Sequence, residues 1–400
     1  MRVALIGNMN NNFFSIMRYL RDLGLDAHLF MYKNQYEHFK PEKDTYKIDK
    51  YRPYIHTLPI VENVKGLLFL DKKRVKEIFR EYDFFIGSGF APAIFYKIDM
   101  TLDIFIPHDD GIEHTTNIPL DLRRLLKKIA RGYVINLQVK GLQKNTTKII
   151  ASAIQEVTNN TLKRLDLTKK NIKKYVPMVY LEEGDNPKLK SIIDKMRGYD
   201  FVIFSHTRQT WREESLEGSL KEDGGKGLDR LIIGYSNFIK KNPNYNPLLI
   251  FFEYGQDVEA SKELIKDLNI EEYVLWLNLM PRKDILQLIG HADIVVDAIR
   301  ATMWGGVGWE GLAKGKILMQ NIVQSDEEYK KEMGHSLPFI MRAFTEEDVE
   351  KHLNDFVSNR QFYLNKASSN KEWFDKYAGI GLAKEYKKII EEIYKNKEIK

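Results

Sequence analysis

The most informative segment of this 400-residue chain is Asp297–Gln320, DAIRATMWGGVGWEGLAKGKILMQ. It follows the apolar run Ile294–Val296, which predicts a buried strand. A helix is expected to begin near Trp309 and to end at Gly315, before another apolar strand. Between strand and helix lies a glycine-rich loop of four residues, Gly305, Gly306, Val307 and Gly308. This order of elements is typical of an α/β fold with parallel strands.

The glycine-rich loop has the composition of an anion-binding turn. Backbone N–H groups at a helix N-terminus form a nest for anions, with the positive end of the helix dipole behind it. Glu310 is expected in the first turn of that helix, where its carboxylate can accept hydrogen bonds from ribose hydroxyls. A tight turn with Glu310 as a simple helix charge fits the same residues. Both interpretations are open on the loop alone.

Two basic residues upstream favour the anion site. Arg208 follows the predicted strand Phe201–Phe204, and Lys226 stands between two glycines where the next helix opens. A point-charge lysine and a fork-shaped arginine at strand-to-helix turns suit a diphosphate. Either residue alone is commonly a solvated surface charge, but both ahead of the same glycine loop indicate phosphate binding.

The whole chain alternates short apolar runs with amphipathic helices, which predicts parallel sheets. Four hundred residues exceed what one core usually supports, so two domains are expected. A stretch from Pro177 to Lys195 interrupts the alternation, and the predicted domains are 1–180 and 181–375. Two Rossmann-like, doubly wound units are expected to face each other across a cleft at the carboxyl ends of their strands.

Composition limits the class of protein. The sequence has no cysteine, which excludes disulfides and thiolate chemistry and agrees with a reducing compartment. No apolar run is long enough for a signal peptide or a membrane span, so a cytoplasmic protein is expected. The net charge of +6 is not concentrated in a basic stripe, so nucleic acid is not an expected partner. The histidines are too scattered for a metal site, and neither a metal nor a cofactor is expected.

From residue 200 to about 325 the sequence resembles the nucleotide-binding half of family 4 glycosyltransferases (glycosyltransferase group 1), which have the GT-B fold. The resemblance covers the first domain in outline only. The segments that carry it are Arg208, Lys226-Gly227, Leu248–Gly255, Val274–Leu277, His291–Val296 and Trp309–Lys316.

The resemblance implies a role for individual residues. Arg208 and Lys226 would bind the diphosphate of a nucleotide-sugar donor, and Glu310 would bind its ribose. The loop after Val274–Leu277 would hold the base through backbone contacts of Asn278, Leu279 and Met280. It further implies that the first domain binds the acceptor, that a chain-terminal helix, 376–400, returns to the first domain, and that the anomeric configuration is retained.

One position departs from the family pattern. Family members usually carry a second glutamate eight positions before the ribose-binding one, and Thr302 stands there in this sequence. Asp297 and Arg300 lie nearby and are candidates for the same sugar-binding pocket, together with Thr302 itself.

The first domain supplies the candidates for chemistry. His108 and Asp109 directly follow a predicted strand, where an acid/base group or a sugar-hydroxyl contact is well placed. A helix cap or a satisfied loop histidine is the alternative for His108. Gly7 and Asn8, in the first strand-to-helix turn, are further sugar-binding candidates, although asparagine-rich turns are common.

Two helical patterns concern partners. The basic amphipathic segment Leu120–Leu142 fits contact with an anionic membrane surface, which would suit a lipid-linked acceptor, and equally fits a surface helix packed on the sheet. The C-terminal helical segment has an apolar stripe that needs a partner surface, made of Leu382, Tyr386, Ile389, Ile390 and Ile393.

Three functions are compatible with these features. The first is transfer of a sugar from a nucleotide-sugar donor to a glycan, lipid-linked or protein acceptor. The second is a sugar-nucleotide epimerase or hydrolase of the same architecture. The third is an inactive nucleotide-sugar-binding protein, suggested by Thr302.

Overall fold

Apolar residues on successive strand positions determine the architecture of the computed structural model. In β8 (Phe201–Phe204), Phe201 and Ile203 join one hydrophobic cluster while Val202 and Phe204 join another. A strand with apolar residues on both sides must be covered on both faces, which is the situation of parallel sheets flanked by helices. The structure describes residues 1–107, 111–117, 125–151, 156–177, 179–216, 225–301 and 305–399.

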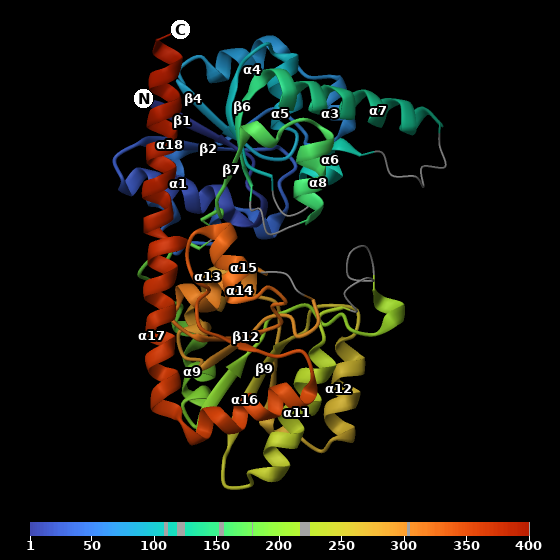
Figure 1. Cartoon of the computed structure of the whole chain (residues 1–400), viewed down its shortest axis with the longest axis vertical. Coiled ribbons are helices and arrows are strands. Elements are labelled where there is room, and N and C mark those ends of the chain that lie inside the picture. Colours follow the sequence, from blue (N-terminus) through green and yellow to red (C-terminus); the bar gives the residue numbers. More distant parts are fainter. Residues whose placement is uncertain are drawn as a thin grey trace. The chain divides into compact units, whose positions relative to one another are not determined.

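The chain divides into two units (Figure 1). Unit 1 comprises 1–182 and 377–400, and unit 2 comprises 183–376. The sequence placed the corresponding boundaries after residues 180 and 375.

Unit 1 is built on one parallel sheet, which has seven strands within the described residues, in the order β3-β2-β1-β4-β5-β6-β7. The strands are β1 (Arg2–Ile6), β2 (Asp26–Met31), β3 (Ile55–Thr57), β4 (Phe84–Gly87), β5 (Leu102–Phe105), β6 (Thr146–Ala151) and β7 (Asn171–Lys173). The helices are α1 (Asn12–Asp22), α2 (Ile48–Tyr51), α3 (Val64–Leu68), α4 (Lys72–Phe79), α5 (Ala91–Lys97), α6 (Gly111–Thr116), α7 (Leu125–Lys140), α8 (Glu156–Arg164) and α18 (Ile380–Glu398).

Helix α18 brings the end of the chain back to unit 1, where it contacts α1 (Figure 1). Tyr386 is fully buried and its hydroxyl donates to the carbonyl of Tyr175 over 2.7 Å. Farther along, the Lys397 ammonium lies 3.3 Å from the buried carboxylate of Asp103 in β5. Both described ends of the chain therefore belong to the same unit.

Unit 2 has a six-stranded parallel sheet within the described residues, ordered β10-β9-β8-β11-β12-β13. Besides β8 its strands are β9 (Pro247–Phe252), β10 (Val274–Leu277), β11 (Ile294–Val296), β12 (Ile317–Gln320) and β13 (Ile340–Arg342). The helices are α9 (Lys190–Met196), α11 (Leu228–Lys241), α12 (Val258–Asp267), α13 (Arg282–Ile289), α14 (Gly306–Ala313), α15 (Asp326–Met333), α16 (Glu346–Ser358) and α17 (Arg360–Tyr377).

Both sheets begin with the strand order of a Rossmann fold. In each unit the order reverses beside the first strand, between β1 and β4 in unit 1 and between β8 and β11 in unit 2. Ligands of open α/β sheets bind at the carboxyl ends of the strands next to such a reversal. The prediction of two doubly wound units is confirmed, and the loops that follow these four strands are where a site is expected.

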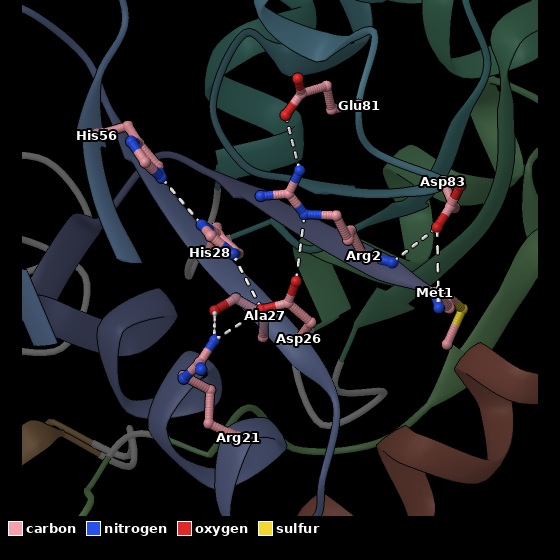
Figure 2. A network of polar contacts seen from close by, with 9 residues as sticks. All are labelled: Met1, Arg2, Arg21, Asp26, Ala27, His28, His56, Glu81 and Asp83. Atoms are coloured by element: carbon pink, nitrogen blue, oxygen red, sulfur yellow. Dashed lines mark hydrogen bonds and ion pairs between the residues drawn. The ribbon is translucent and has the colours of Figure 1, made fainter. Parts of the chain in front are cut away.

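The opposite, amino end of the unit 1 sheet carries a polar network (Figure 2). Arg2 pairs with Asp26 and Glu81, and Asp26 also accepts from Arg21. His28 lies 3.0 Å from Asp26. This network stands away from the strand ends at which a ligand is expected.

One local prediction of helix position was wrong. A helix was expected from about Trp309, with the glycines before it as a loop, but α14 begins at Gly306. The Asp297 carboxylate accepts a hydrogen bond from the N–H of Gly308 over 3.1 Å, which caps the new first turn and lets glycine residues be helical there. The glycines therefore form the first turn of α14.

Among the described residues, no helix is both long and apolar enough to cross a membrane. Helix α7 packs Val134 and Leu137 into the unit 1 core and exposes Ile129 and Tyr133. Residues 120–124 of the basic segment lie outside the described residues.

Candidate functional site

Lys226 ties two loops together at the strand-order reversal of unit 2. Its N–H donates to the Thr210 carbonyl over 2.7 Å, and its carbonyl accepts from Ile299 N over 2.8 Å. Thr210 follows β8 and Ile299 follows β11, the two strands that flank the reversal. Gly225 and Gly227 on either side have φ of +83° and +70°, a backbone region that favours glycine.

Arg208 lies on the loop directly after β8, and its neighbour Gln209 fixes that loop. Gln209 N donates to the Tyr254 carbonyl over 2.7 Å, and the Gln209 carbonyl accepts from Asp257 N over 3.0 Å. Gly255 has φ of +123°, and a Cβ there would stand 2.2 Å from the Gln209 carbonyl oxygen, so only glycine permits this approach.

The side chains of Arg208 and Lys226 carry charges without a counter-ion. Arg208 is exposed and Lys226 is half-buried, and within the described part of the chain neither side chain makes a hydrogen bond or an ion pair. Two cations on loops joined by hydrogen bonds are available for an anionic ligand.

Asp257 is a buried carboxylate that sequence reasoning missed. Its Oδ2 accepts hydrogen bonds from Trp211 N at 2.6 Å, Arg212 N at 2.9 Å and Ser215 Oγ at 2.6 Å. These bonds hold the loop that leads away from Arg208. The signal in the sequence was its position after the end of β9, the same kind of position that singled out Arg208.

Asp297, at the carboxyl end of β11, lies against the glycines at the N-terminus of α14. Its carboxylate is 2% exposed. A Cβ on Gly305 would lie 2.5 Å from Asp297 Oδ2, so glycine is needed for this close approach. Because Asp297 already accepts from Gly308 N, one N–H of the predicted anion nest is used within the protein.

Gln320, the last residue of β12, lies beside the same turn. It is 1% exposed, and both polar atoms of its amide lack a hydrogen-bond partner within the described residues. Its Oε1 is 2.9 Å from the position of a Cβ on Gly308. A buried, unpartnered amide is costly, and sequence analysis gave no reason to select this residue.

Glu310 lies in α14 with its carboxylate held between two basic side chains. Arg282 Nε donates to Oε1 over 2.6 Å, and His206 Nε2 lies 2.9 Å from Oε2. Burial raises the pKa of Glu310, but the charge of Arg282 and the neighbouring His206 outweigh burial and bring the pKa to about 2. The carboxylate is therefore ionised at neutral pH.

Arg282 also connects Glu310 to the predicted base-binding loop. That loop, Asn278 to Met280, follows β10 and ends two residues before Arg282, the first residue of α13. Asn278 and Leu279 are exposed, and Met280 packs partly against the core of unit 2. The structure thus links the loop and Glu310 at one end of the sheet.

In unit 1, Gly7 and Asn8 occupy the turn after β1. Gly7 has φ of +97°, and a Cβ there would lie 2.3 Å from Ser88 Oγ. Asn8 is buried, with Oδ1 accepting from Phe14 N at 2.9 Å and Nδ2 donating to the Phe39 carbonyl at 2.7 Å. Both polar groups of Asn8 are used to hold the turn together.

Three predicted residues, His108, Asp109 and Thr302, lie outside the described residues. Arg300 follows β11, and its backbone packs against Gly227, whose Cβ position is 2.8 Å from Arg300 N. Over the described ranges no group of three or more His, Cys, Asp or Glu residues is arranged to hold a metal ion.

Comparison with solved structures identifies the class of fold. No protein-family model matches this chain, and no curated protein matches its sequence. Solved structures do match. The Anabaena protein HepE, in a crystal structure with UDP and glucose, superposes with a TM-score of 0.65 at 13% identity, covering 98% of this chain and 100% of HepE.

Two further structures cover nearly the whole chain. A glycosyltransferase from Rickettsia africae matches with a TM-score of 0.61 at 18% identity, over 99% of each chain. A putative UDP-N-acetylglucosamine 2-epimerase from Listeria monocytogenes matches with a TM-score of 0.57 at 12% identity, over 96% of this chain and 93% of the epimerase. With its two parallel-sheet Rossmann-like units, the chain has the GT-B fold.

Proposed function

We propose that the protein is a glycosyltransferase that takes a sugar from a nucleotide-sugar donor. The observation that carries the proposal is the pair of cations Arg208 and Lys226, which have no counter-ion among the described residues and lie on hydrogen-bonded loops at the strand-order reversal of unit 2. A diphosphate requires such charges. Three crystal structures of HepE contain UDP or UDP-glucose, which supports a nucleoside diphosphate as part of the ligand.

The proposed chemistry breaks the bond between the anomeric carbon and the diphosphate oxygen and forms a new bond from that carbon to the oxygen of an acceptor hydroxyl. The hydroxyl loses its proton as this bond forms, and the departing diphosphate takes it up. Negative charge develops on the departing diphosphate, and Arg208 and Lys226 stabilise it. With two cations and the N-terminus of α14 in this role, the proposal includes neither a metal ion nor a cofactor. Retention of the anomeric configuration and membership of family 4 are part of the proposal.

We assign the donor's nucleoside to the other end of the same site. Glu310 would bind the ribose, because a carboxylate has about four lone-pair positions and those not directed at Arg282 and His206 stay available. The base would lie on the backbone of Asn278, Leu279 and Met280. Asp297, Arg300 and Thr302 are assigned to the donor sugar.

Unit 1 would supply the acceptor side and the reacting groups. His108 and Asp109 are proposed to contact the donor sugar near its reacting carbon, with Gly7 and Asn8 lining the same strand ends. The acceptor is a glycan, a lipid-linked compound or a protein. We propose a cytoplasmic location, with peripheral membrane contact through Leu120–Leu142. The exposed Ile129 and Tyr133 of α7 support that contact.

An epimerase or hydrolase is the second candidate, because an epimerase is among the similar structures. The test is incubation with a panel of radiolabelled nucleotide sugars, with and without cell-derived acceptors. A labelled acceptor product supports glycosyl transfer. A labelled epimer or free sugar as the sole product supports the second candidate, and binding without any product indicates an inactive binding protein.

A further inference from the structure

A cluster at the carboxyl ends of the unit 1 strands has no role in the function proposed so far. Glu62 follows β3, Tyr32 follows β2, and Gly89 follows β4. The Lys33 N–H donates to the Ile60 carbonyl over 2.8 Å, which holds the segment after β3 against the segment after β2. The three residues therefore come together beside the strand-order reversal, where ligands of such sheets bind.

Among the described residues, the Glu62 carboxylate has one hydrogen-bond partner. Its Oε1 accepts one long hydrogen bond, 3.4 Å from Phe90 N. Its Oε2 has no partner among the described residues, and the residue is half-buried. No basic side chain of the described ranges pairs with it. A half-buried carboxylate that is neither paired nor fully hydrogen-bonded is unusual, because such groups are costly unless satisfied.

The backbone beside Glu62 is shaped to admit its carboxylate. Gly89 has φ of +56°, and a Cβ at this position would stand 1.9 Å from Glu62 Oε1. Any other residue would displace the carboxylate. The carbonyl of Gly89 accepts from Gln138 Nε2 over 2.9 Å, so α7 holds this turn in place.

Tyr32 provides a second polar group without a partner. Its side chain is 2% exposed, and its hydroxyl makes no hydrogen bond within the described residues. Its ring atom Cε2 lies 3.4 Å from the Cβ position of Gly7, so the hydroxyl end of the ring is at the turn after β1. A buried phenol without a partner among the described residues is able to bond a polar atom of a ligand.

We propose that Glu62 and Tyr32 form a binding site for a hydroxyl group of an uncharged, sugar-like acceptor. The hydroxyl donates to the free oxygen of Glu62, and the ligand brings a polar atom to the phenol of Tyr32. The inference rests on the proposed function, since it assigns the acceptor of the same reaction to unit 1.

The electrostatic surroundings determine the ligand class. An anionic acceptor group is disfavoured here, because the ionised form of Glu62 would repel it. Burial raises the pKa of Glu62 to about 7, which shows surroundings of low polarity. In such surroundings a second ion would bear its own desolvation cost, so a neutral hydroxyl is favoured over an amine.

The test uses the full chain and a panel of methyl glycosides of glucose, galactose, mannose and N-acetylglucosamine, with methyl glucosaminide as the amine. Saturation-transfer NMR measures glycoside binding without requiring turnover. At pH 8, where a carboxyl group with a pKa of about 7 is mostly ionised, Glu62→Gln should weaken binding of at least one glycoside about tenfold or more, the effect of one charged hydrogen bond. Tyr32→Phe, which removes only the unpartnered hydroxyl, should weaken it several-fold.

The matched control is Glu77→Gln, the same change at an exposed residue of α4 in the same unit. It should leave binding unchanged. The site is refuted by three outcomes: no glycoside binds the wild type, binding survives both substitutions, or methyl glucosaminide alone binds. Calorimetry with UDP on the same variants tests the proposed function separately. If UDP does not bind to the wild type, the donor assignment is overturned, whether or not the glycosides bind.

Discussion

Arg282 Nε lies 2.6 Å from Glu310 Oε1, and this pair joins the start of α13 to the helix that follows the glycine turn. Both side chains are largely buried, at 14% and 6% exposure. A buried ion pair is costly to break, because removing one partner leaves an uncompensated charge. The pair therefore fixes Glu310 in the position proposed for ribose binding.

Replacing Arg282 by methionine should lower the free energy of unfolding by about 3 kcal/mol or more at neutral pH. The pKa of Glu310 is about 2 in the folded protein, against an ordinary value of 4.5. Its ionisation therefore stabilises the folded protein fully above about pH 4.5. That contribution is lost as pH falls towards 2, so the difference between wild type and variant should shrink there. Urea denaturation of both proteins at neutral pH and at low pH measures this difference in the free energy of unfolding.

Arg197→Met is the control for this experiment. Arg197 pairs with Asp194 on the surface at three residues' spacing, and surface pairs of this kind contribute little. If both substitutions lower the free energy of unfolding equally, the Arg282–Glu310 pair stabilises the fold no more than a surface pair does.

Arg208→Ala and Lys226→Ala should each weaken UDP binding by about 1.5–3 kcal/mol, the loss of one charged hydrogen bond. Uridine, which has no phosphate, should bind these variants almost as well as it binds the wild type. Isothermal calorimetry with the two ligands separates the effects. Lys266→Ala, at an exposed position of α12, is the control. Equal losses for uridine and UDP would remove both residues from the diphosphate site.

Much of the fold was predictable from the sequence, because short apolar strands and the amphipathic helices between them are local patterns, and their alternation favours parallel sheets. The runs at Phe201–Phe204 and Leu248–Phe252 are strands in the structure. Gly306 was misassigned, because the first turn of α14 is capped by a hydrogen bond from Gly308 N to Asp297, which lies eleven residues before Gly308 in the sequence.

The candidate site was less predictable, for a similar reason. Strand-end positions selected Arg208 and Lys226, whose roles remain predictions. Arg282 and Glu62 were missed because their significance depends on distant residues. Arg282 meets Glu310 28 residues later, and Glu62 meets the turn at Gly89. No local pattern marks such contacts.

Two neighbouring glycines give a matched test of the N-terminus of α14, since Gly305 caps the helix and Gly306 is its first residue. Gly305→Ala places a methyl group 2.5 Å from Asp297 Oδ2, so we expect a loss of about 1–3 kcal/mol in stability and weaker UDP binding. Gly306→Ala meets nothing within 4 Å and should be neutral or stabilising by up to about 1 kcal/mol. Thermal unfolding with and without UDP compares the two. A reversed order would show that Asp297 does not fill the turn.

The chain's last helix should be indispensable to unit 1. Deleting residues from 380 onward removes α18 and exposes the surface of α1 that it covers, so we expect insoluble protein. Tyr386→Phe removes only the hydrogen bond to the Tyr175 carbonyl and should cost about 1 kcal/mol, measured by urea denaturation. Tyr394→Phe, nearer the end of α18, is the control. A soluble, fully active truncation would contradict this role.

The histidine pair of unit 1 predicts how stability depends on pH. His28 Nδ1 and His56 Nε2 lie 2.9 Å apart, so one ring must be neutral to accept the hydrogen bond (Figure 2). Burial lowers the pKa of His28 below 6.5, with Asp26 acting in the opposite direction and Arg2 and Arg21 adding to the decrease. Burial also lowers the pKa of His56, and His28 and Arg2 contribute.

Since both folded pKa values are below the ordinary 6.5, the unfolded chain binds more protons than the folded protein as pH falls below that value. The stability that the neutral histidine pair contributes is fully present above pH 6.5. It is lost as the pH falls towards the pKa values of the folded protein. Each such proton contributes up to about 1.4 kcal/mol per pH unit to the slope of the free energy of unfolding against pH.

His56→Phe keeps an aromatic ring against Phe30 and should reduce this slope between neutral pH and about pH 5. His114→Gln, at an exposed position of α6, should leave the slope unchanged. Urea denaturation across this pH range decides the matter, and an unaltered slope in His56→Phe would show that the pair titrates as it does in the unfolded chain.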